Sequence, residues 1–248
     1  MASTSETGHA KNAANFEDLI SFCTGYGATY NPSKVSIKLP GLSTLLTSAN
    51  AALQAVKVAK TAYDNATNAR EIAFKPLKPL ATKIINALAS TDAAGQTVDD
   101  AKSTNTKIQG KRAKTIKEPE PSAVGVAVAP VKTASTSQQS YDKLIDHFAQ
   151  LIQTLTAEAK YLPNENELKV ATLNTLLADL KAKNTAVINA TTTLSNARIA
   201  RDKVMYSDDI GLIDIARDVK QYVKSLFGAS SPQYKQISGL EFKAIKGD

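Results

Sequence analysis

Few side chains in this 248-residue sequence have the types and spacing that perform catalysis. Ser140 and Lys143 match the minimal Ser-x-x-Lys pattern in which a lysine activates a serine nucleophile. The motifs that accompany this pair are missing, and Ser140 also suits the N-cap of a helix. His9 and His147 are the only histidines, and neither has the neighbouring cysteines or carboxylates that metal spacing requires. The sequence therefore predicts no catalytic residue and no metal ligand.

Phosphate-binding and thiol chemistry are not favoured either. Gly25-Tyr26-Gly27 is interpreted as a helix stop, because neither G-x-x-x-x-G-K-[ST] nor G-x-G-x-x-G occurs. Cys23 is the only cysteine, so no internal disulfide can form. Its apolar neighbours and the lack of an adjacent base predict a buried structural thiol. We expect no cofactor, no small-molecule substrate and no enzymatic activity.

One long pattern in the chain does recur. The stretch 42–74 reappears as 173–205 at a constant offset of 131 residues. In both copies apolar residues are spaced by three and four positions, alanine is abundant, and glycine and proline are absent. This pattern is typical of long amphipathic helices. We therefore predict two copies of one helical unit around two long helices.

Three polar positions match between the two copies. The pairs are Asn65 and Asn196, Arg70 and Arg201, and Glu71 and Asp202. A functional interpretation makes them a symmetric ligand site. A structural interpretation makes them a polar layer that fixes helix register by pairing across the bundle. We favour the structural polar layer.

Shorter helices are expected around the long ones. A helix carrying Phe16 and Cys23 has a counterpart that begins after Ser140, at an offset of 132. Pro76 and Pro79 break the chain before another short helix. In the second copy we expect the equivalent helix to open at Asp208 and Asp209 and to end at Gly228, and we expect Asn164 and Glu167 to form a capping box.

These segments predict a domain organisation of five parts. They are a flexible arm (1–14), helical repeat 1 (15–106), a basic linker rich in Pro, Ser and Thr (107–140), helical repeat 2 (141–228) and a C-terminal tail (229–248). The expected fold is all-α, an elongated bundle of two tandem repeats. Alternating apolar residues at 35–39, 124–128 and 240–245 add the expectation of a small β-sheet.

Charge and hydropathy bear on partners and location. The net charge of +7 fits a solvated basic surface, and it also permits binding to nucleic acid. The basic run 107–117 has no interleaved aromatic residues for stacking on bases, so nucleic acid is a less favoured partner. The polar start 1–15 lacks a signal-peptide core, and 123–130 is too short to span a membrane as a helix. We expect a cytoplasmic protein.

Two phrases resemble known sequences. Residues 68–77 (NAREIAFKPL) and 233–242 (QYKQISGLEF) are similar to hypothetical proteins of Bacteroidota, and the resemblance covers most of the chain. It implies a bacterial source and carries no assigned activity.

The duplication leads to the functional expectation. A duplicated helical unit presents similar surfaces at both ends, and such surfaces favour head-to-tail contacts that close into rings or continue as filaments. We expect a non-enzymatic structural protein that forms homo-oligomers. The alternatives are a helical membrane-acting or pore-forming protein and a nucleic-acid-binding scaffold.

Overall fold

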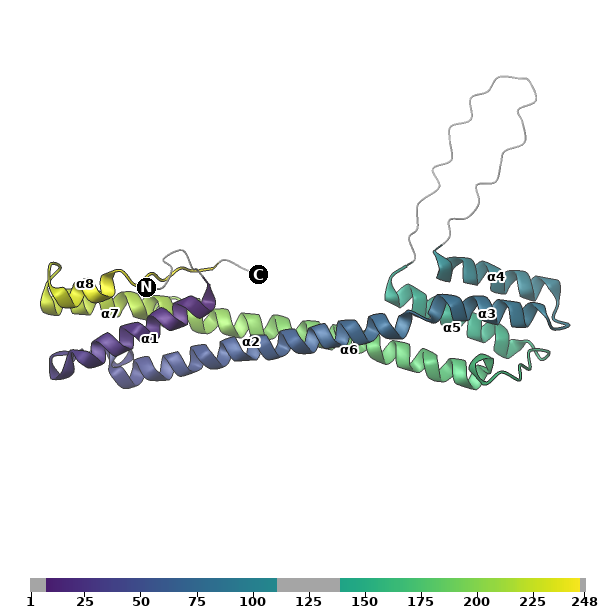
Figure 1. Cartoon of the computed structure of the whole chain (residues 1–248), viewed down its shortest axis with the longest axis horizontal. Coiled ribbons are helices and arrows are strands. Elements are labelled where there is room, and N and C mark those ends of the chain that lie inside the picture. Colours follow the sequence, from purple (N-terminus) through teal and green to yellow (C-terminus); the bar gives the residue numbers. More distant parts are fainter. Residues whose placement is uncertain (1–7, 111–138, 246–248) are drawn as a thin grey trace, which may run out of the picture. The chain divides into compact units, whose positions relative to one another are not determined.

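The computed structural model describes residues 8–110 and 139–245, and all of their regular structure is helical (Figure 1). The helices are α1 (His9–Gly25), α2 (Leu39–Phe74), α3 (Leu77–Ala89), α4 (Gly95–Gln109), α5 (Tyr141–Ala157), α6 (Val170–Tyr206), α7 (Leu212–Phe227) and α8 (Pro232–Ser238). Three 3-10 turns, η1 (Gly27–Thr29), η2 (Val35–Ile37) and η3 (Asn166–Leu168), join them. No strand forms in these two ranges. The all-α class is confirmed.

The element boundaries confirm the duplication. Helix α5 has the same 17-residue length as α1 at an offset of 132. Turn η3 repeats η2 at an offset of 131, and α6 begins 131 residues after α2. The two long helices span 36 and 37 residues. The repeated sequence therefore produces a repeated local structure.

The long helices share a stripe of inward-facing positions with alternating spacings of four and three. In α2 these positions are Leu42, Leu46, Ala49, Leu53, Val56, Lys60, Tyr63, Thr67, Arg70 and Phe74, and in α6 they are Leu173, Leu177, Leu180, Asn184, Val187, Thr191, Leu194, Arg198, Arg201 and Met205. Only Lys60 and Thr191 are exposed, and they occupy equivalent positions of the two copies. The stripe expected from the apolar spacing is therefore observed. The exposed position that interrupts it is the same in both copies, Lys60 in α2 and Thr191 in α6.

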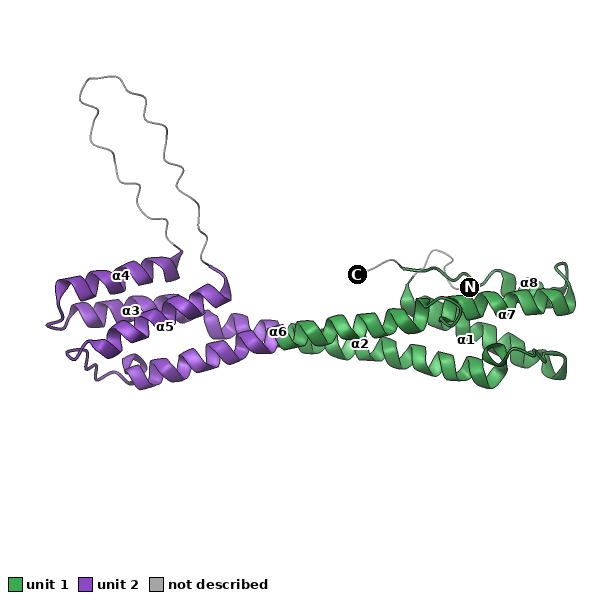
Figure 2. Ribbon diagram, turned by 180° about the vertical axis from the view of Figure 1, so that it is seen from behind, with its two compact units in different colours: residues 1–65, 189–248 green, residues 66–188 purple. Residues whose placement is uncertain are grey.

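The helices form two compact units, coloured separately in Figure 2. Unit 1 contains residues 1–65 and 189–248, and unit 2 contains residues 66–188. Each unit therefore combines the first half of one repeat with the second half of the other. This exchange follows from helix continuity, because α2 and α6 each run on without a breaking residue and leave the unit in which they began.

Each unit has its own apolar core. In unit 1 the core gathers around Phe16, Leu19, Cys23, Leu42, Met205, Leu212, Ile215, Val219 and Ile237. In unit 2 it gathers around Phe74, Leu77, Ile84, Leu88, Ile108, Phe148, Leu151, Leu155, Leu173 and Leu180. Both cores draw on a short helix, on both long helices and on the helices that follow them.

Several predicted helix limits differ from the structure. Helix α1 begins at His9, so residues 9–14 of the expected flexible arm are helical. Gly95 opens α4, a helix that the sequence interpretation missed and that continues to Gln109, inside the expected linker. Helix α4 has a weakly apolar sequence and is stabilised by packing between α3 and α5, which its own pattern does not indicate.

Two predicted helix starts in the second copy are wrong. Helix α7 begins at Leu212 with Gly211 as its N-cap, after a turn in which Asp209 has a φ of 65°. Asn164 and Glu167 do not form a capping box, because Glu167 lies in η3 and the following helix begins at Val170. Ser140, Pro76 and Gly228 do flank helices as expected, and the backbone N–H of Lys143 donates to Ser140 Oγ at 3.3 Å.

The expected small sheet does not form in the described residues. Residues 35–39 make the turn η2 and the start of α2, while 240–245 are extended without a strand partner. Segment 124–128 lies outside the described residues. The buried hydroxyl of Tyr30 donates to Ile37 O at 2.6 Å, and Tyr161 donates to Leu168 O at 2.9 Å in the second copy. A stretch whose sequence diverges thus folds into the same turn twice.

Candidate functional site

The six residues of the predicted polar layer are distributed over both units. Arg70 and Glu71 lie in unit 2, and the other four lie in unit 1. Asn65, Asn196 and Glu71 are exposed on the long helices. Of the six, Arg201 and Asp202 meet each other, with 2.8 Å between Nε and Oδ1. Arg201 is 4% exposed, so this neighbouring carboxylate partly compensates the desolvation of its guanidinium.

Arg70 finds its partners elsewhere in unit 2. Its Nη1 donates to Asn184 Oδ1 at 3.0 Å, and Asn184 Nδ2 donates to Asp142 Oδ1 at 2.8 Å. Its guanidinium carbon lies 4.0 Å from the centroid of the Tyr141 ring, which itself meets Phe74 edge-to-face. This arrangement holds α5, α2 and α6 together by a cation–π contact and hydrogen bonds.

Sequence reasoning missed Asn184, although a signal for it exists. Asn184 takes the stripe position at which the first copy has Leu53, and it is 6% exposed. A polar residue that interrupts an otherwise apolar stripe requires a buried partner. Comparing the two copies position by position would have singled out Asn184, but it would not have identified Arg70 as its partner.

The histidines lie in different units. His9 in unit 1 lies 2.5 Å from the hydroxyl of Tyr206, measured from Nδ1. His147 in unit 2 is buried, and desolvation lowers its pKa, with Lys107 adding to the effect. Its Nε2 has no hydrogen-bond partner among the residues that the structure describes. A neutral, buried imidazole packed beside Phe148 fits a core position.

Cys23 occupies the core of unit 1, as the sequence predicts. It is 0% exposed, and burial raises the pKa of its thiol to about 11, an effect that a hydrogen bond with Tyr30 partly offsets. A thiol with so high a pKa carries little thiolate at neutral pH and is a poor nucleophile.

The described residues contain neither a candidate metal cluster nor a candidate membrane-spanning helix. Within 8–110 and 139–245, no three side chains of His, Cys, Asp or Glu gather in a way that could hold a metal ion. No helix in the same ranges has the length and apolar character needed to cross a membrane.

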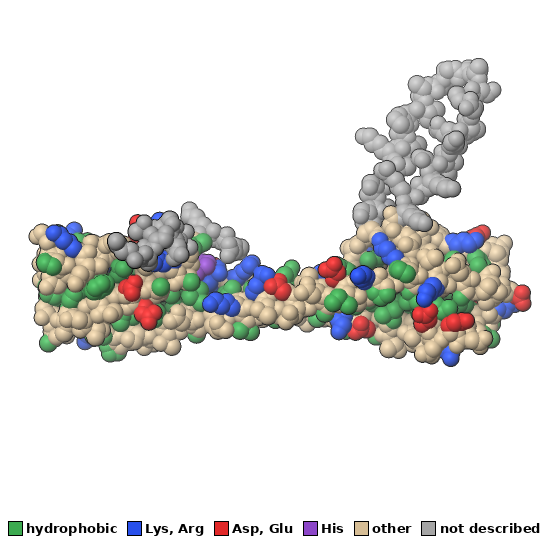
Figure 3. Space-filling model, in the orientation of Figure 1, with side chains coloured by type: hydrophobic (Ala, Val, Ile, Leu, Met, Phe, Trp, Pro, Cys, Tyr) green, Lys and Arg blue, Asp and Glu red, His purple; other side chains and the backbone are tan. Residues whose placement is uncertain are grey.

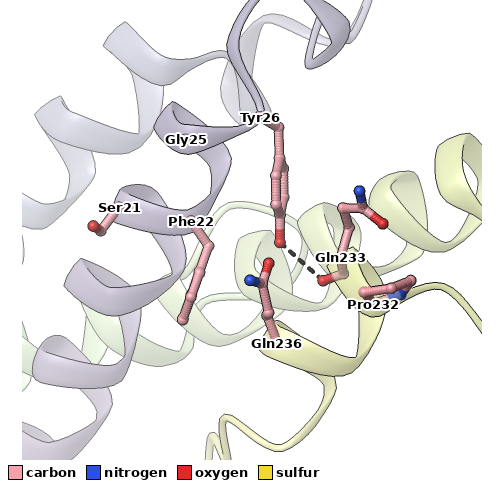
Figure 4. A pocket seen from close by; sticks show the side chains of 7 residues that line it. All are labelled: Ser21, Phe22, Gly25, Tyr26, Pro232, Gln233 and Gln236. Carbon is pink, nitrogen blue, oxygen red and sulfur yellow. Dashed lines mark hydrogen bonds between the residues drawn. The ribbon is translucent and has the colours of Figure 1, made fainter.

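A hollow of about 310 Å³ lies between α1 and α8 in unit 1 (Figure 4). It is lined by Ser21, Phe22, Gly25, Tyr26, Pro232, Gln233 and Gln236. The side chain of Tyr26 crosses the hollow, and its hydroxyl donates to Gln233 O at 2.9 Å. The lining carries no carboxylate, lysine, arginine or histidine, so it provides neither acid–base groups nor an ion partner.

A second hollow, of about 360 Å³, lies in unit 2. Two of its lining residues, Phe74 and Tyr141, also belong to the group of side chains that contact Arg70 or its ring partner. It is lined by Glu71, Phe74, Lys75, Leu77, Lys78, Tyr141 and Leu144. Its charged groups have both signs, and Lys78 Nζ already donates to Gln139 Oε1 at 2.8 Å. The hollow therefore lacks a converging set of groups for one kind of ligand.

A polar contact between distant parts of the sequence joins α1 to the C-terminal chain. Asn12 Nδ2 donates to Lys243 O at 2.8 Å, and Lys243 N donates to Asn12 Oδ1 at 3.1 Å. Asn15 Nδ2 donates to Glu241 O at 2.6 Å. Both asparagines are buried, at 2% and 5% exposure. They therefore hold an extended segment through its backbone.

Sequence reasoning missed this site because it treated the polar start of α1 as solvated. Asn12 and Asn15 precede Phe16 and Leu19 at a spacing that places them on the same helix face. Polar side chains on a buried face indicate a partner, but sequence spacing alone does not identify it. The partner lies 226 and 231 residues away along the chain.

The surface charges are mixed. Acidic and basic side chains occur together on both units in the face that Figure 3 shows. Several of them form exposed pairs, such as Lys60 with Asp64 and Lys83 with Glu167. Of the predicted basic run, Lys107 lies in α4, and residues 111–117 fall outside the described residues.

Comparison of the chain with protein-family models, with curated proteins and with solved structures found no match.

Proposed function

We propose that this chain is a non-enzymatic structural protein that self-associates into a ring or filament. The observation that carries the proposal is the set of branched aliphatic side chains that both units expose on the long helices. Unit 1 exposes Val58 (60%) and Ile199 (64%), and unit 2 exposes Ile72 (71%) and Ile188 (54%). Exposed apolar side chains mark a contact surface when they gather into a patch, and the proposal assigns these four residues to such contacts.

The duplication adds support. Each unit takes one of its two residues in this set from α2 and the other from α6, so one chain carries two related surfaces. A heterologous contact between two such surfaces generates rings when its rotation closes and filaments when it does not. The four-and-three spacing of the inward positions is also that of a coiled coil, in which long helices form extended scaffolds.

The proposal is tested by size-exclusion chromatography with light scattering over a range of concentrations, followed by negative-stain microscopy. We expect species larger than the 26.4 kDa monomer that grow with concentration. The double variant Ile188→Lys with Ile199→Lys should shift them to the monomer, because a charge placed in an apolar contact must be desolvated.

Matched controls keep the test specific. Val35 (73%) and Leu162 (81%) are equally exposed but lie outside the long helices. The double variant Val35→Lys with Leu162→Lys should associate like the unaltered chain, with the same circular dichroism spectrum. If the unaltered chain is a monomer at every concentration, the proposal is wrong.

A further inference from the structure

We propose that the face of unit 1 formed by α1 and α7 is a docking site for an extended peptide and that, in the assembly, residues 239–245 of a second copy occupy it. We call this face the tail site and residues 239–245 the tail segment. In the structure, the chain's own tail segment lies in the tail site. The inference rests on the proposed self-association and specifies one of its contacts.

Recognition of the tail segment is largely through its backbone. Asn12 both donates to and accepts from Lys243, and Asn15 donates to Glu241 O. This pairing resembles the addition of a strand to a sheet edge, with side-chain amides in place of a neighbouring backbone. Because the bonds involve only N–H and C=O groups, the geometry selects an extended conformation.

Side chains supply the specificity. Phe242 meets Phe16 edge-to-face, with 6.5 Å between ring centroids, and Lys220 Nζ lies 5.3 Å from the centroid of Phe242. Lys220 Nζ also donates to Ser238 O and Leu240 O, next to the end of α8. The tail site therefore prefers an extended segment with one aromatic anchor.

The tail segment follows α8, a helix of seven residues that Ile237 anchors in the core of unit 1. The tail segment can therefore leave its own site only by turning at the link to α8. Gly239 links the two, and a Cβ built at Gly239 would meet no atom within 4 Å. Because glycine has no Cβ, the backbone at this link can turn through conformations that other residues disfavour.

The second copy shows that this helix face accepts different occupants. In unit 2, α5 is the counterpart of α1, and helix α4 packs against α5. Ala101 and Ile108 of α4 are 0% exposed there. In unit 1 the tail segment and Ile237 take the corresponding role. The tail segment of a second copy can form the same hydrogen bonds in this site. Exchange between two molecules therefore keeps every contact of the tail segment and changes only the backbone conformation at Gly239.

The test uses the unaltered full chain and a synthetic peptide of residues 239–248. We expect excess peptide to shift the light-scattering mass of the assembly toward the monomer. A peptide with Phe242→Ala should need at least a tenfold higher concentration for the same shift. A peptide carrying benzophenone at position 242 should crosslink to α1 or α7.

Variants of the full chain provide the matched comparison. The double variant Asn12→Ala with Asn15→Ala should bind a fluorescent peptide at least tenfold more weakly than the unaltered chain. Asn65→Ala with Asn196→Ala removes two exposed asparagines and should leave binding unchanged. If the double variant Asn12→Ala with Asn15→Ala does not fold, the Phe242→Ala peptide still tests the tail site with the unaltered chain.

The outcomes separate this inference from the proposed function. An assembly that forms but ignores the peptide, without crosslinks at α1 or α7, overturns the inference and leaves self-association standing. Peptide binding by a chain that never assembles overturns the second copy as the occupant, and the proposed function with it. Dissociation by the unaltered peptide, but not by Phe242→Ala, supports both.

Discussion

Single buried hydrogen bonds hold the turns before both long helices. Tyr30 and Tyr161 are 6% and 4% exposed, and each donates to a backbone carbonyl seven residues further along. Loss of either hydroxyl leaves a buried carbonyl without its partner. Tyr30→Phe and Tyr161→Phe should each lower the free energy of unfolding by about 1–2 kcal/mol in urea titrations. Tyr63→Phe, in the half-buried middle of α2, should change it by less than about 0.5 kcal/mol.

Asn184 is a second residue whose role depends on its partners. Replacing it by leucine restores the residue type of the first copy but removes the acceptor of Arg70 and the donor to Asp142. Asn184→Leu should therefore destabilise the protein by about 1–3 kcal/mol, measured by chemical denaturation. Asn196→Leu, on the exposed side of the same helix, is the control. A stabilised Asn184→Leu would contradict the hydrogen-bonded cluster.

His147 predicts a dependence of stability on pH. Burial lowers its pKa below the usual 6.5, Lys107 and Lys143 lower it further, and Asp146 opposes them. Below pH 6.5 the unfolded chain therefore binds a proton that the folded chain does not, and stability falls with acidification until the folded pKa is reached. Thermal melts between pH 5 and 8 should show this slope, and His147→Gln should flatten it. An unchanged slope in His147→Gln would assign the effect to other groups.

At the scale of elements, α1 is held by apolar packing on one face and by the tail segment on its polar start. Cys23 near the end of α1 reports on that packing, because it is 0% exposed and has a pKa of about 11. At pH 8 its reaction with a thiol reagent should be slower than that of a free thiol by a factor of about 100 or more, from the pKa alone. Denaturant should make the reaction immediate.

An exposed cysteine on the same helix controls for this measurement. Glu17 is exposed on α1, so Glu17→Cys should react at once in the folded protein while Cys23 stays protected. Equal rates at both positions would mean that α1 opens readily from the core of unit 1.

At the scale of the whole molecule, each unit takes half of each repeat. Cleavage at a protease site introduced within 111–138 separates the repeats covalently but leaves both cores with contributions from both fragments. The two fragments should therefore co-elute under native conditions and separate in denaturant, as seen by size-exclusion chromatography and mass spectrometry. Fragments that separate without denaturant would mean that each repeat folds by itself.

Much of the fold could be predicted from local pattern. The offset of 131 residues appears when the chain is compared with itself. The long helices, the buried Cys23, the cap at Ser140 and the helix end at Gly228 are predicted from residues close together in the sequence. Helix periodicity and capping act over a few residues, so they are readable without the rest of the molecule.

What only the tertiary structure decided involves partners distant in sequence. The expected polar layer paired residues of the two copies, whereas Arg70 binds Asn184 and Tyr141, and Arg201 binds its neighbour Asp202. The polar start of α1 became buried because the tail segment supplies its hydrogen bonds. The exchange of half-repeats between units follows because α2 and α6, both unbroken, each begin in one unit and end in the other. Local sequence determines that such helices form, and only packing determines which cores they join.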